Sequence, residues 1–216
     1  TGLQGLAHSE LAFQRSLAYS RDRLQMRSLS GPKNPAGPAD PIIVHPDVRR
    51  MLLWMKAHVE GMRSFVYYVA KCFDLLENAA SEEEKALYQG FTDLLTPLVK
   101  AYCAQRGFDV CIQAMQVYGG YGYTREYPVE QLARDCKIAS IYEGTDGIQA
   151  MDLLGRKLGM DEGKVFMGFM GVTGRELNAM SALYPVLMII VGTSDVVHIM
   201  SKYIDELRRG EPQNRA

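Results

Sequence analysis

The sequence has almost no net charge and opens without a recognisable secretory signal. Lysine and arginine total 24, aspartate and glutamate total 25, and the formal net charge is −1. A nucleic-acid-binding surface is normally clearly basic, so no nucleic-acid partner is expected. No secretory signal opens the chain, and no initiator methionine does either, because it enters at Thr1 within an apparent helix. We therefore expect a fragment of a longer, cytoplasmic protein.

Cysteine is scarce and lacks any pairing pattern. The four cysteines are Cys72, Cys103, Cys111 and Cys136. None forms a CxxC pair and no histidine lies at ligand spacing from them, so no metal site is predicted. We expect reduced packing residues, as in a reducing compartment.

Hydrophobic residues, at 47%, are plentiful enough for a packed core. Helical spacing predicts a first helix over residues 3–29, followed by a loop that contains prolines 32, 35, 38, 41 and 46. A second helix is expected over 47–77, where apolar residues alternate at spacings of four and three. No β-strand pattern appears before residue 160, which indicates an all-α, up-and-down four-helix-bundle-like fold.

A third helix is expected to begin at Ser81, which forms a capping box with Glu84. Its apolar positions are taken as Leu87, Phe91, Leu94, Leu98, Ala101, Phe108, Ile112 and Met115. Pro97 interrupts this pattern. Either the helix kinks there, or Thr96 caps a new helix with Pro97 in its first turn, which is the preferred interpretation. Shorter helices are expected over 129–137 and 146–158.

The segment from residue 116 to 158 holds the candidate chemistry. GGYGY sets glycines among aromatic residues, and backbone without Cβ atoms admits a flat ligand or its phosphates; a helix cap and turn is the alternative. In IYEGTDG, Glu143 lies in a tight turn before a helix that Thr145 or Asp146 could cap. The glutamate is either a solvated loop residue or a base whose proton affinity is raised by burial.

The block QVYGGYGYTREYPVEQLARDCKIASIYEGT resembles the signature of the acyl-CoA dehydrogenases, and specifically their C-terminal domain. LAYSRDRLQ at 17–25 and IIVHPDVRRML at 42–52 are similar to two further parts of that domain. The proline-rich insert and the GRKL ending look most like the branch that contains methylmercaptopropionyl-CoA dehydrogenase. We therefore expect this domain over residues 1–160.

This resemblance implies a FAD-dependent α,β-desaturation of an acyl-CoA thioester, with Glu143 as the catalytic base. Tyr142 and Gly144 match residues beside the acyl-CoA substrate. The residues that match contacts to FAD are Arg23, Leu24, Gln25, His45, Gln116, Val117, Tyr118, Gly119, Gly120 and Thr145. In the family, the contacts of the Arg23 and Gln116 type reach the FAD of a neighbouring subunit, which implies a homodimer or homotetramer. Electron-transfer flavoprotein or a similar acceptor is the implied partner.

The chain departs from the family pattern in two ways. Pro46 and Gly147 stand where glutamines that contact the ligands are common. The family's N-terminal helical domain and middle β-domain, which supply most of the flavin pocket, are also missing from the sequence. We therefore predict that the isolated chain has no dehydrogenase activity. A non-catalytic helical oligomerisation module is an alternative.

Residues 161–216 differ in character, with an apolar centre from residue 182 to 191. This hydrophobic helical tail resembles a transmembrane segment of resistance–nodulation–division or MMPL-type transporters, in which Asp195 would match a proton-relay aspartate. The resemblance implies a junction with an unrelated transporter and membrane contact through residues 181–200. A membrane-anchored or transporter-derived fusion is thus a second alternative, and an ordinary hydrophobic helix that caps the bundle is a third.

Overall fold

The structure, a computed structural model, describes residues 1–173 of the chain. The chain divides into two compact units, Thr1–Val165 and Phe166–Ala216. The α-helices are α1 (Gly2–Asp22), α2 (Pro46–Glu77), α3 (Glu82–Tyr118), α4 (Val129–Lys137), α5 (Asp146–Asp152) and α6 (Lys164–Val172). Short 3₁₀ segments are η1 (Ile42–Val44), η2 (Gly119–Tyr123), η3 (Ile138–Ser140) and η5 (Met160–Gly163), and η4 (Leu153–Lys157) is a π-helical turn. The described part of the chain contains no strand, so the predicted all-α class is confirmed there.

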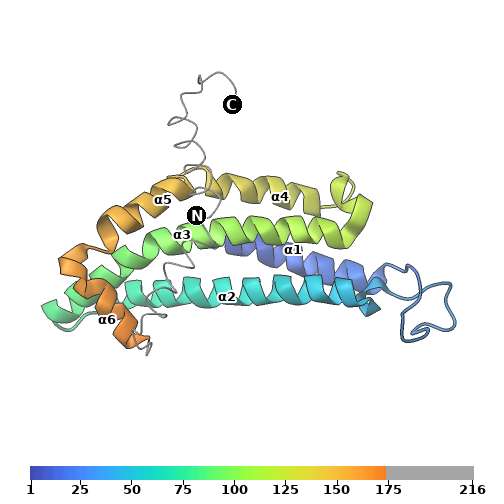
Figure 1. Ribbon diagram of the computed structural model, residues 1–216, viewed down its shortest axis with the longest axis horizontal. Coiled ribbons are helices and arrows are strands. Elements are labelled where there is room, and N and C mark those ends of the chain that lie inside the picture. The colour runs from blue at the N-terminus through green and yellow to red at the C-terminus, as the bar shows by residue number, and fades with distance from the viewer. Residues whose placement is uncertain (174–216) are drawn as a thin grey trace, which may run out of the picture. The chain divides into compact units, whose positions relative to one another are not determined.

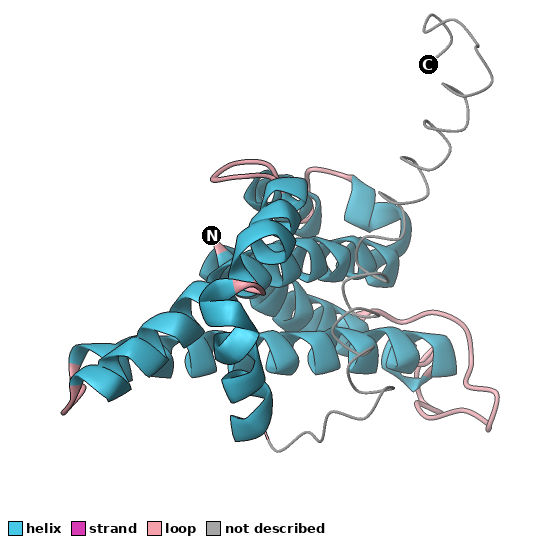
Figure 2. Cartoon of the chain, turned by 60° about the vertical axis from the view of Figure 1, so that its left-hand side comes forward, coloured by secondary structure: helices cyan, strands magenta, loops and turns pink. Residues whose placement is uncertain are grey.

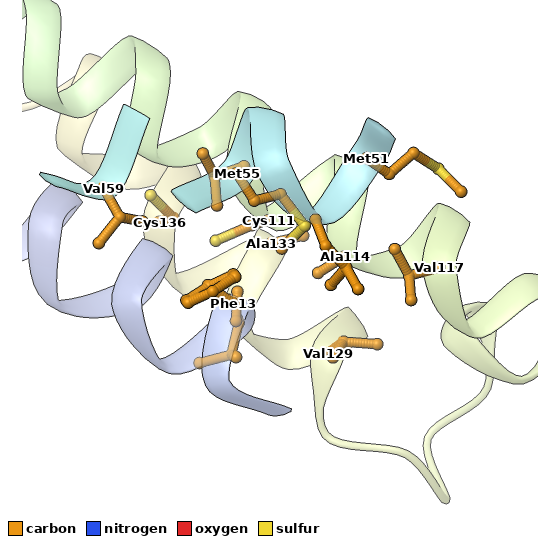
Figure 3. Packing of buried hydrophobic residues seen from close by; sticks show 14 of the residues in the cluster. Phe13, Met51, Met55, Val59, Cys111, Ala114, Val117, Val129, Ala133 and Cys136 are labelled. Atoms are coloured by element: carbon orange, nitrogen blue, oxygen red, sulfur yellow. The ribbon is translucent and has the colours of Figure 1, made fainter. Parts of the chain in front are cut away.

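Helices α1 to α4 form the body of the first unit. Figure 1 shows them side by side, with each helix running opposite to the one before it. Their apolar faces meet in one core, where Phe13 of α1, Met55 of α2, Cys111 of α3 and Ala133 of α4 point toward one another (Figure 3). Burying a large apolar side chain such as Phe13 or Met55 contributes roughly 1.5–3 kcal/mol, so the helices depend on this shared core for their stability.

The closest helix contact is between α1 and α3 and depends on two glycines. A Cβ added to Gly5 would lie 2.1 Å from the carbonyl oxygen of Cys103. One added to Gly107 would lie 2.5 Å from the carbonyl oxygen of Gly5. Both distances are far below van der Waals contact, so only glycine lets the two backbones approach this closely.

Helix α1 ends at Asp22, whereas the sequence predicted a helix to residue 29. Residues 23–26 instead pair with the chain before α2: Gln25 N–H donates to the Asp40 carbonyl at 2.9 Å, and Ile42 N–H donates to the Arg23 carbonyl at 2.8 Å. Met26 has a positive φ of 60°, which a helix excludes. The prediction was wrong because these hydrogen bonds across the loop replace those of a further helical turn.

Asp40 organises the loop between α1 and α2, which projects from the helices in Figure 2. The residue is fully buried, and its carboxylate accepts N–H groups from Ser28 at 2.8 Å, Lys33 at 2.9 Å and Asn34 at 2.7 Å. Arg27 lies 3.4 Å from the same carboxylate. The hydrogen bond from Ser28 N–H and the two other N–H donors hold the Asp40 pKa down at about 2. The proline-rich insert is thus built around one buried anion.

The predicted second and third helices are confirmed, with different details at Pro46 and Pro97. α2 begins at Pro46 rather than Asp47, with His45 as its N-cap residue, and Ser81 caps α3 by accepting from Glu84 N–H at 3.2 Å. The preferred break at residues 96 and 97 is wrong, because α3 runs through Pro97 without ending. Proline costs an isolated helix about 3 kcal/mol, and the buried face of α3 offsets that cost.

The apolar face assigned to the second half of α3 is correct only in part, because Phe108 and Met115 pack against the core but Ile112 does not. Ile112 is 45% exposed. The buried positions are mostly small residues: Cys103, Ala104, Gly107, Val110, Cys111 and Ala114. Small side chains are fully buried here because α1 lies so close, and a choice by hydrophobic size does not identify them.

The predicted tail lies outside the described residues from position 174 onward. Among residues 1–173, none of the helices combines the length and the apolar character that a membrane span requires. The resemblance to a transporter therefore has no support in the described part of the chain.

Candidate functional site

A cavity of about 420 Å³ lies where the end of α1, the start of α2 and the end of α3 meet. Its lining includes eight of the residues predicted to contact FAD: Arg23, Gln25, His45, Gln116, Val117, Tyr118, Gly119 and Gly120. They come from three segments far apart in the sequence. The fold brings most of the predicted cofactor residues to one place.

Arg23 offers this cavity a positive charge that is not used elsewhere. Its guanidinium carbon lies 4.9 Å from the centre of the Tyr121 ring, and no ion pair within residues 1–173 involves it. The ring supports one face of the guanidinium and leaves its N–H fork available. Such a fork suits the oxygens of a phosphate.

Stacked tyrosines form the wall behind Arg23. The rings of Tyr19 and Tyr118 lie 4.0 Å apart at 14°, and those of Tyr121 and Tyr127 lie 5.0 Å apart at 12°. Burial raises the pKa of Tyr19 and of Tyr118, so both remain neutral phenols at ordinary pH. Flat, uncharged faces of this kind suit a planar aromatic ligand.

The backbone at Gly119 and Gly120 is open. Gly119 has a φ of 63°, and no atom lies within 4 Å of a Cβ placed on either glycine. On the other side of the cavity, a His45 ring nitrogen lies 2.8 Å from the Gln25 carbonyl, which fixes the imidazole. A free guanidinium, accessible glycine backbone and aromatic faces fit a ligand with both a pyrophosphate and a flat ring system, as FAD has.

Two predicted cofactor residues do not line this cavity. Leu24 is 39% exposed and pairs with Pro41 through an isolated bridge. Thr145 lies in a different part of the fold, where its hydroxyl caps α5 by accepting from Ile148 N–H at 3.4 Å. This second location also holds Tyr142, Glu143 and Gly144.

Glu143 occupies a strained turn between α4 and α5. Glu143 has a φ of 54° and Gly144 a φ of 86°. For a residue other than glycine, this left-handed conformation costs about 1–3 kcal/mol and persists only where surrounding contacts enforce it. The carboxylate accepts the Thr1 hydroxyl, and the neighbouring Tyr142 hydroxyl donates to the Gln4 amide oxygen. The Glu143 side chain is 64% exposed, so the burial expected for a base is not found within this chain.

Two long side chains hold this turn from behind. Gln149 donates to the carbonyls of Glu143 at 3.2 Å and Gly144 at 3.3 Å. The ammonium of Lys100 donates to the same Gly144 carbonyl and lies 3.8 Å from an Asp146 carboxylate oxygen. Sequence reasoning missed Lys100, because a lysine inside a long helix is normally read as a surface residue.

The two locations lie at opposite ends of α1. Thr1 and Gln4 contact the Glu143 turn, whereas Tyr19 and Arg23 line the cavity. A helix rises about 1.5 Å per residue, so a span of this length covers roughly 30 Å. Glu143 of one chain therefore cannot reach a ligand group held at Arg23 of the same chain.

The acyl-CoA dehydrogenase C-terminal domain family matches residues 1–158. The chain belongs to this family. It is 45% identical over 168 residues to 3-methylmercaptopropionyl-CoA dehydrogenase of Ruegeria pomeroyi, covering 78% of this chain, and 39% identical over 174 residues to a butyryl-CoA dehydrogenase of Syntrophomonas wolfei, covering 81%. The chain spans 28% of the length of each of these relatives.

Solved structures agree with the assignment to the acyl-CoA dehydrogenases. Butyryl-CoA dehydrogenase of Megasphaera elsdenii superposes with a TM-score of 0.53 at 27% identity, over 73% of this chain and 34% of that one. The expected similarity to acyl-CoA dehydrogenases, including the one that acts on methylmercaptopropionyl-CoA, is confirmed. Family members are flavoproteins, and the cavity around Arg23 is lined by eight of the residues that the sequence predicted to contact FAD.

Proposed function

We propose that this chain is the C-terminal part of a FAD-dependent acyl-CoA dehydrogenase and that Glu143 removes the α proton of an acyl-CoA thioester. FAD, when bound, supplies the acceptor for the hydride that leaves the β carbon. Tyr142 and Gly144 flank the base and are assigned to the acyl-CoA. Because the chain covers little of its relatives' length, the complete activity belongs to a longer protein, and the isolated chain is expected to be inactive.

The backbone conformation of the Glu143 turn is the observation that supports this proposal. The chain maintains an unfavourable backbone conformation at Glu143 and secures the following carbonyl with Lys100 and Gln149. The result is a carboxylate on a fixed backbone that remains 64% exposed and accessible to a substrate. A base needs both a fixed position and access to the proton that it removes.

The test replaces Glu143 by Gln in the FAD-loaded protein that carries this chain. Acyl-CoA-dependent bleaching of the flavin should fall by about 10²–10⁴-fold, as for loss of a general base. Glu162→Gln is the matched control, because Glu162 is also a glutamate with positive φ (56°) but has no assigned role. Equal bleaching rates for the two variants would reject the role of Glu143.

FAD binding is tested separately at Arg23. Replacing Arg23 by Gln removes a charge-assisted contact of about 1.5–3 kcal/mol, which raises the Kd for FAD roughly tenfold to a hundredfold. Arg21→Gln, two residues earlier in α1, serves as the control because Arg21 does not line the cavity. An unchanged Kd for FAD in Arg23→Gln would show that the cavity does not bind FAD through Arg23. Leu24 and Thr145, the two predicted contacts outside the cavity, stay within the proposal as contacts that the rest of the assembly completes.

The assembly proposed is a homodimer or homotetramer in which the Arg23 cavity of one subunit completes the site that holds Glu143 of another. The separation of the two locations along α1 supports this arrangement. Mixing subunits of Arg23→Gln and Glu143→Gln should then regenerate sites with both native residues in mixed dimers. Sites contained within single subunits would give no recovery on mixing, and that result would overturn the shared arrangement.

Three further assignments belong to the same proposal. Electron-transfer flavoprotein or a similar carrier is the acceptor, and reoxidation of the acyl-CoA-reduced protein by that carrier tests it. The protein is assigned to the cytoplasm. Residues 161–216 are assigned to a separate hydrophobic segment, which contacts a membrane through residues 181–200. Partition between membrane and soluble fractions, with and without residues 161–216, tests that assignment, and unchanged partition would reject it.

A further inference from the structure

Lys100 is the most deeply placed lysine near the Glu143 turn. Its side chain is 8% exposed, although it belongs to the middle of α3. Placing an ammonium group away from water is unfavourable unless its N–H groups find partners. Here the partners are the Gly144 carbonyl and, at 3.8 Å, the Asp146 carboxylate.

Both partners belong to the segment that follows the base. Gly144 is the residue directly after Glu143, and Asp146 is the first residue of α5. Lys100 therefore connects α3, one of the long helices of the core, to the turn and to the helix that continues from it. One side chain thus secures the left-handed conformation at Glu143 and Gly144 from the core side.

One oxygen of the Asp146 carboxylate, Oδ1, is buried, although the side chain as a whole is 32% exposed. Burial raises its pKa, while the charge of Lys100 is the largest influence in the opposite direction. Its Oδ1 atom, the one 3.8 Å from the Lys100 ammonium, has no hydrogen-bond partner. The attraction to Lys100, with a smaller contribution from Lys137, thus favours the charged carboxylate and helps to hold the start of α5 against α3.

We propose that Lys100 is a positioning residue for the base: by anchoring the Gly144 carbonyl and the Asp146 carboxylate to α3, it sets the direction in which the Glu143 carboxylate points. This inference rests on the proposed role of Glu143. A base acts only within about 2.6–3.2 Å of the proton-bearing atom, so a small displacement of its backbone matters. A misplacement of about 1 Å can lower a rate roughly hundredfold.

The test compares two lysines in the FAD-loaded protein that carries this chain. Lys100→Met should lower kcat about hundredfold with KM changed less than about threefold, because the base is displaced while acyl-CoA binding remains. The matched control is Lys157→Met. Lys157 is also poorly exposed, at 13%, and also reaches α3, at 3.2 Å from Asp93, but it does not contact the turn. Its kcat should remain within about twofold of the parent.

A purely structural role is distinguished by combining Lys100→Met with Glu143→Gln. If Lys100 acts through Glu143, the double variant should be no slower than Glu143→Gln alone, because the group that Lys100 positions is already gone. Asp146→Asn, which keeps the size of the side chain and so preserves folding, should give an intermediate loss of about tenfold in kcat. Equal kcat values for Lys100→Met and Lys157→Met, or an additive double variant, would overturn the proposal.

Amide hydrogen exchange gives a readout that does not depend on activity. Exchange across residues 143–149 should accelerate in Lys100→Met and remain unchanged in Lys157→Met. If the parent protein fails to reduce its flavin with any acyl-CoA, the proposed function is wrong, whereas the exchange comparison still decides the anchor. Unchanged exchange in Lys100→Met would reject the anchoring role, whatever the activity.

Discussion

The close contact of α1 with α3 predicts a large effect of a single methyl group at Gly107. In Gly107→Ala, the new Cβ would meet the Gly5 carbonyl oxygen at 2.5 Å and the Gly5 carbonyl carbon and Cα at 2.9 Å. These are backbone atoms of the facing helix, which cannot rotate away as a flexible side chain would. Helix α1 must therefore shift away from α3.

The magnitude follows from two opposing contributions. Alanine is favoured over glycine inside a helix by about 1 kcal/mol. Overpacking a well-packed interior costs about 1–3 kcal/mol, and contact with rigid backbone places this site at the upper end. The expected net loss is about 2 kcal/mol, which lowers the Tm of a chain of this size by roughly 4–8 °C.

Gly61→Ala is the matched control for this prediction. Gly61 also lies inside a long helix, α2, but it is exposed and nothing lies within 4 Å of its added Cβ. This variant should gain about 0.5–1 kcal/mol from helix propensity alone. Thermal unfolding followed by circular dichroism compares the two variants with the parent. A Gly107→Ala chain as stable as Gly61→Ala would show that α1 and α3 are not packed as the structure has them.

Three further predictions concern stability and reactivity. The Asp40 pKa of about 2 lies below the ordinary value of 3.8, so its contribution to stability is complete above that value and is lost as the pH falls toward 2. Asp40→Asn should therefore reduce the fall in the free energy of unfolding at acid pH, measured by urea unfolding. An unchanged dependence of that free energy on pH would contradict this. Ser81→Ala removes the α3 cap and should cost about 1 kcal/mol by the same measurement. Burial raises the Cys103 pKa to about 12, so its thiol should resist alkylation until the chain unfolds; rapid modification of the native protein, mapped by mass spectrometry, would argue against its burial.

Some elements could be predicted because their signals are local. The alternation of four and three from Val48 onward describes most of α2, since Leu52, Met55, Val59, Met62 and Val69 are buried. It fails near the end of the helix, where Phe73 is 46% exposed and Cys72 is buried instead. The Ser81 and Glu84 capping box marks the start of α3 for the same reason. The cavity residues were identified through resemblance rather than periodicity, and the fold brings eight of the ten together.

Other features could not be predicted because they depend on contacts distant in sequence. The end of α1 is set by hydrogen bonds to Asp40 and Ile42, nearly twenty residues later. The buried positions of α3 between residues 103 and 114 are mostly small residues that fit the close approach of α1, and a pattern of large apolar residues does not reveal them. Lys100 was missed for the same reason, because its partners Gly144 and Asp146 meet it only in the folded chain.

Helix α3 connects the Glu143 turn to the Arg23 cavity of the same chain, and the position of Pro97 relative to these two locations matters. Lys100 anchors the Glu143 turn, and Gln116 lines the cavity at the end of the same helix. The intervening segment contains no proline and covers about 24 Å at the usual helical rise. Pro97 lies before Lys100, so the missing backbone N–H of proline does not fall within this segment. Gly107 lies within it, so a methyl group there disturbs the packing that keeps the spacing constant. In the proposed assembly, each α3 thus sets where its subunit offers Glu143 to one shared site and the Arg23 cavity to another.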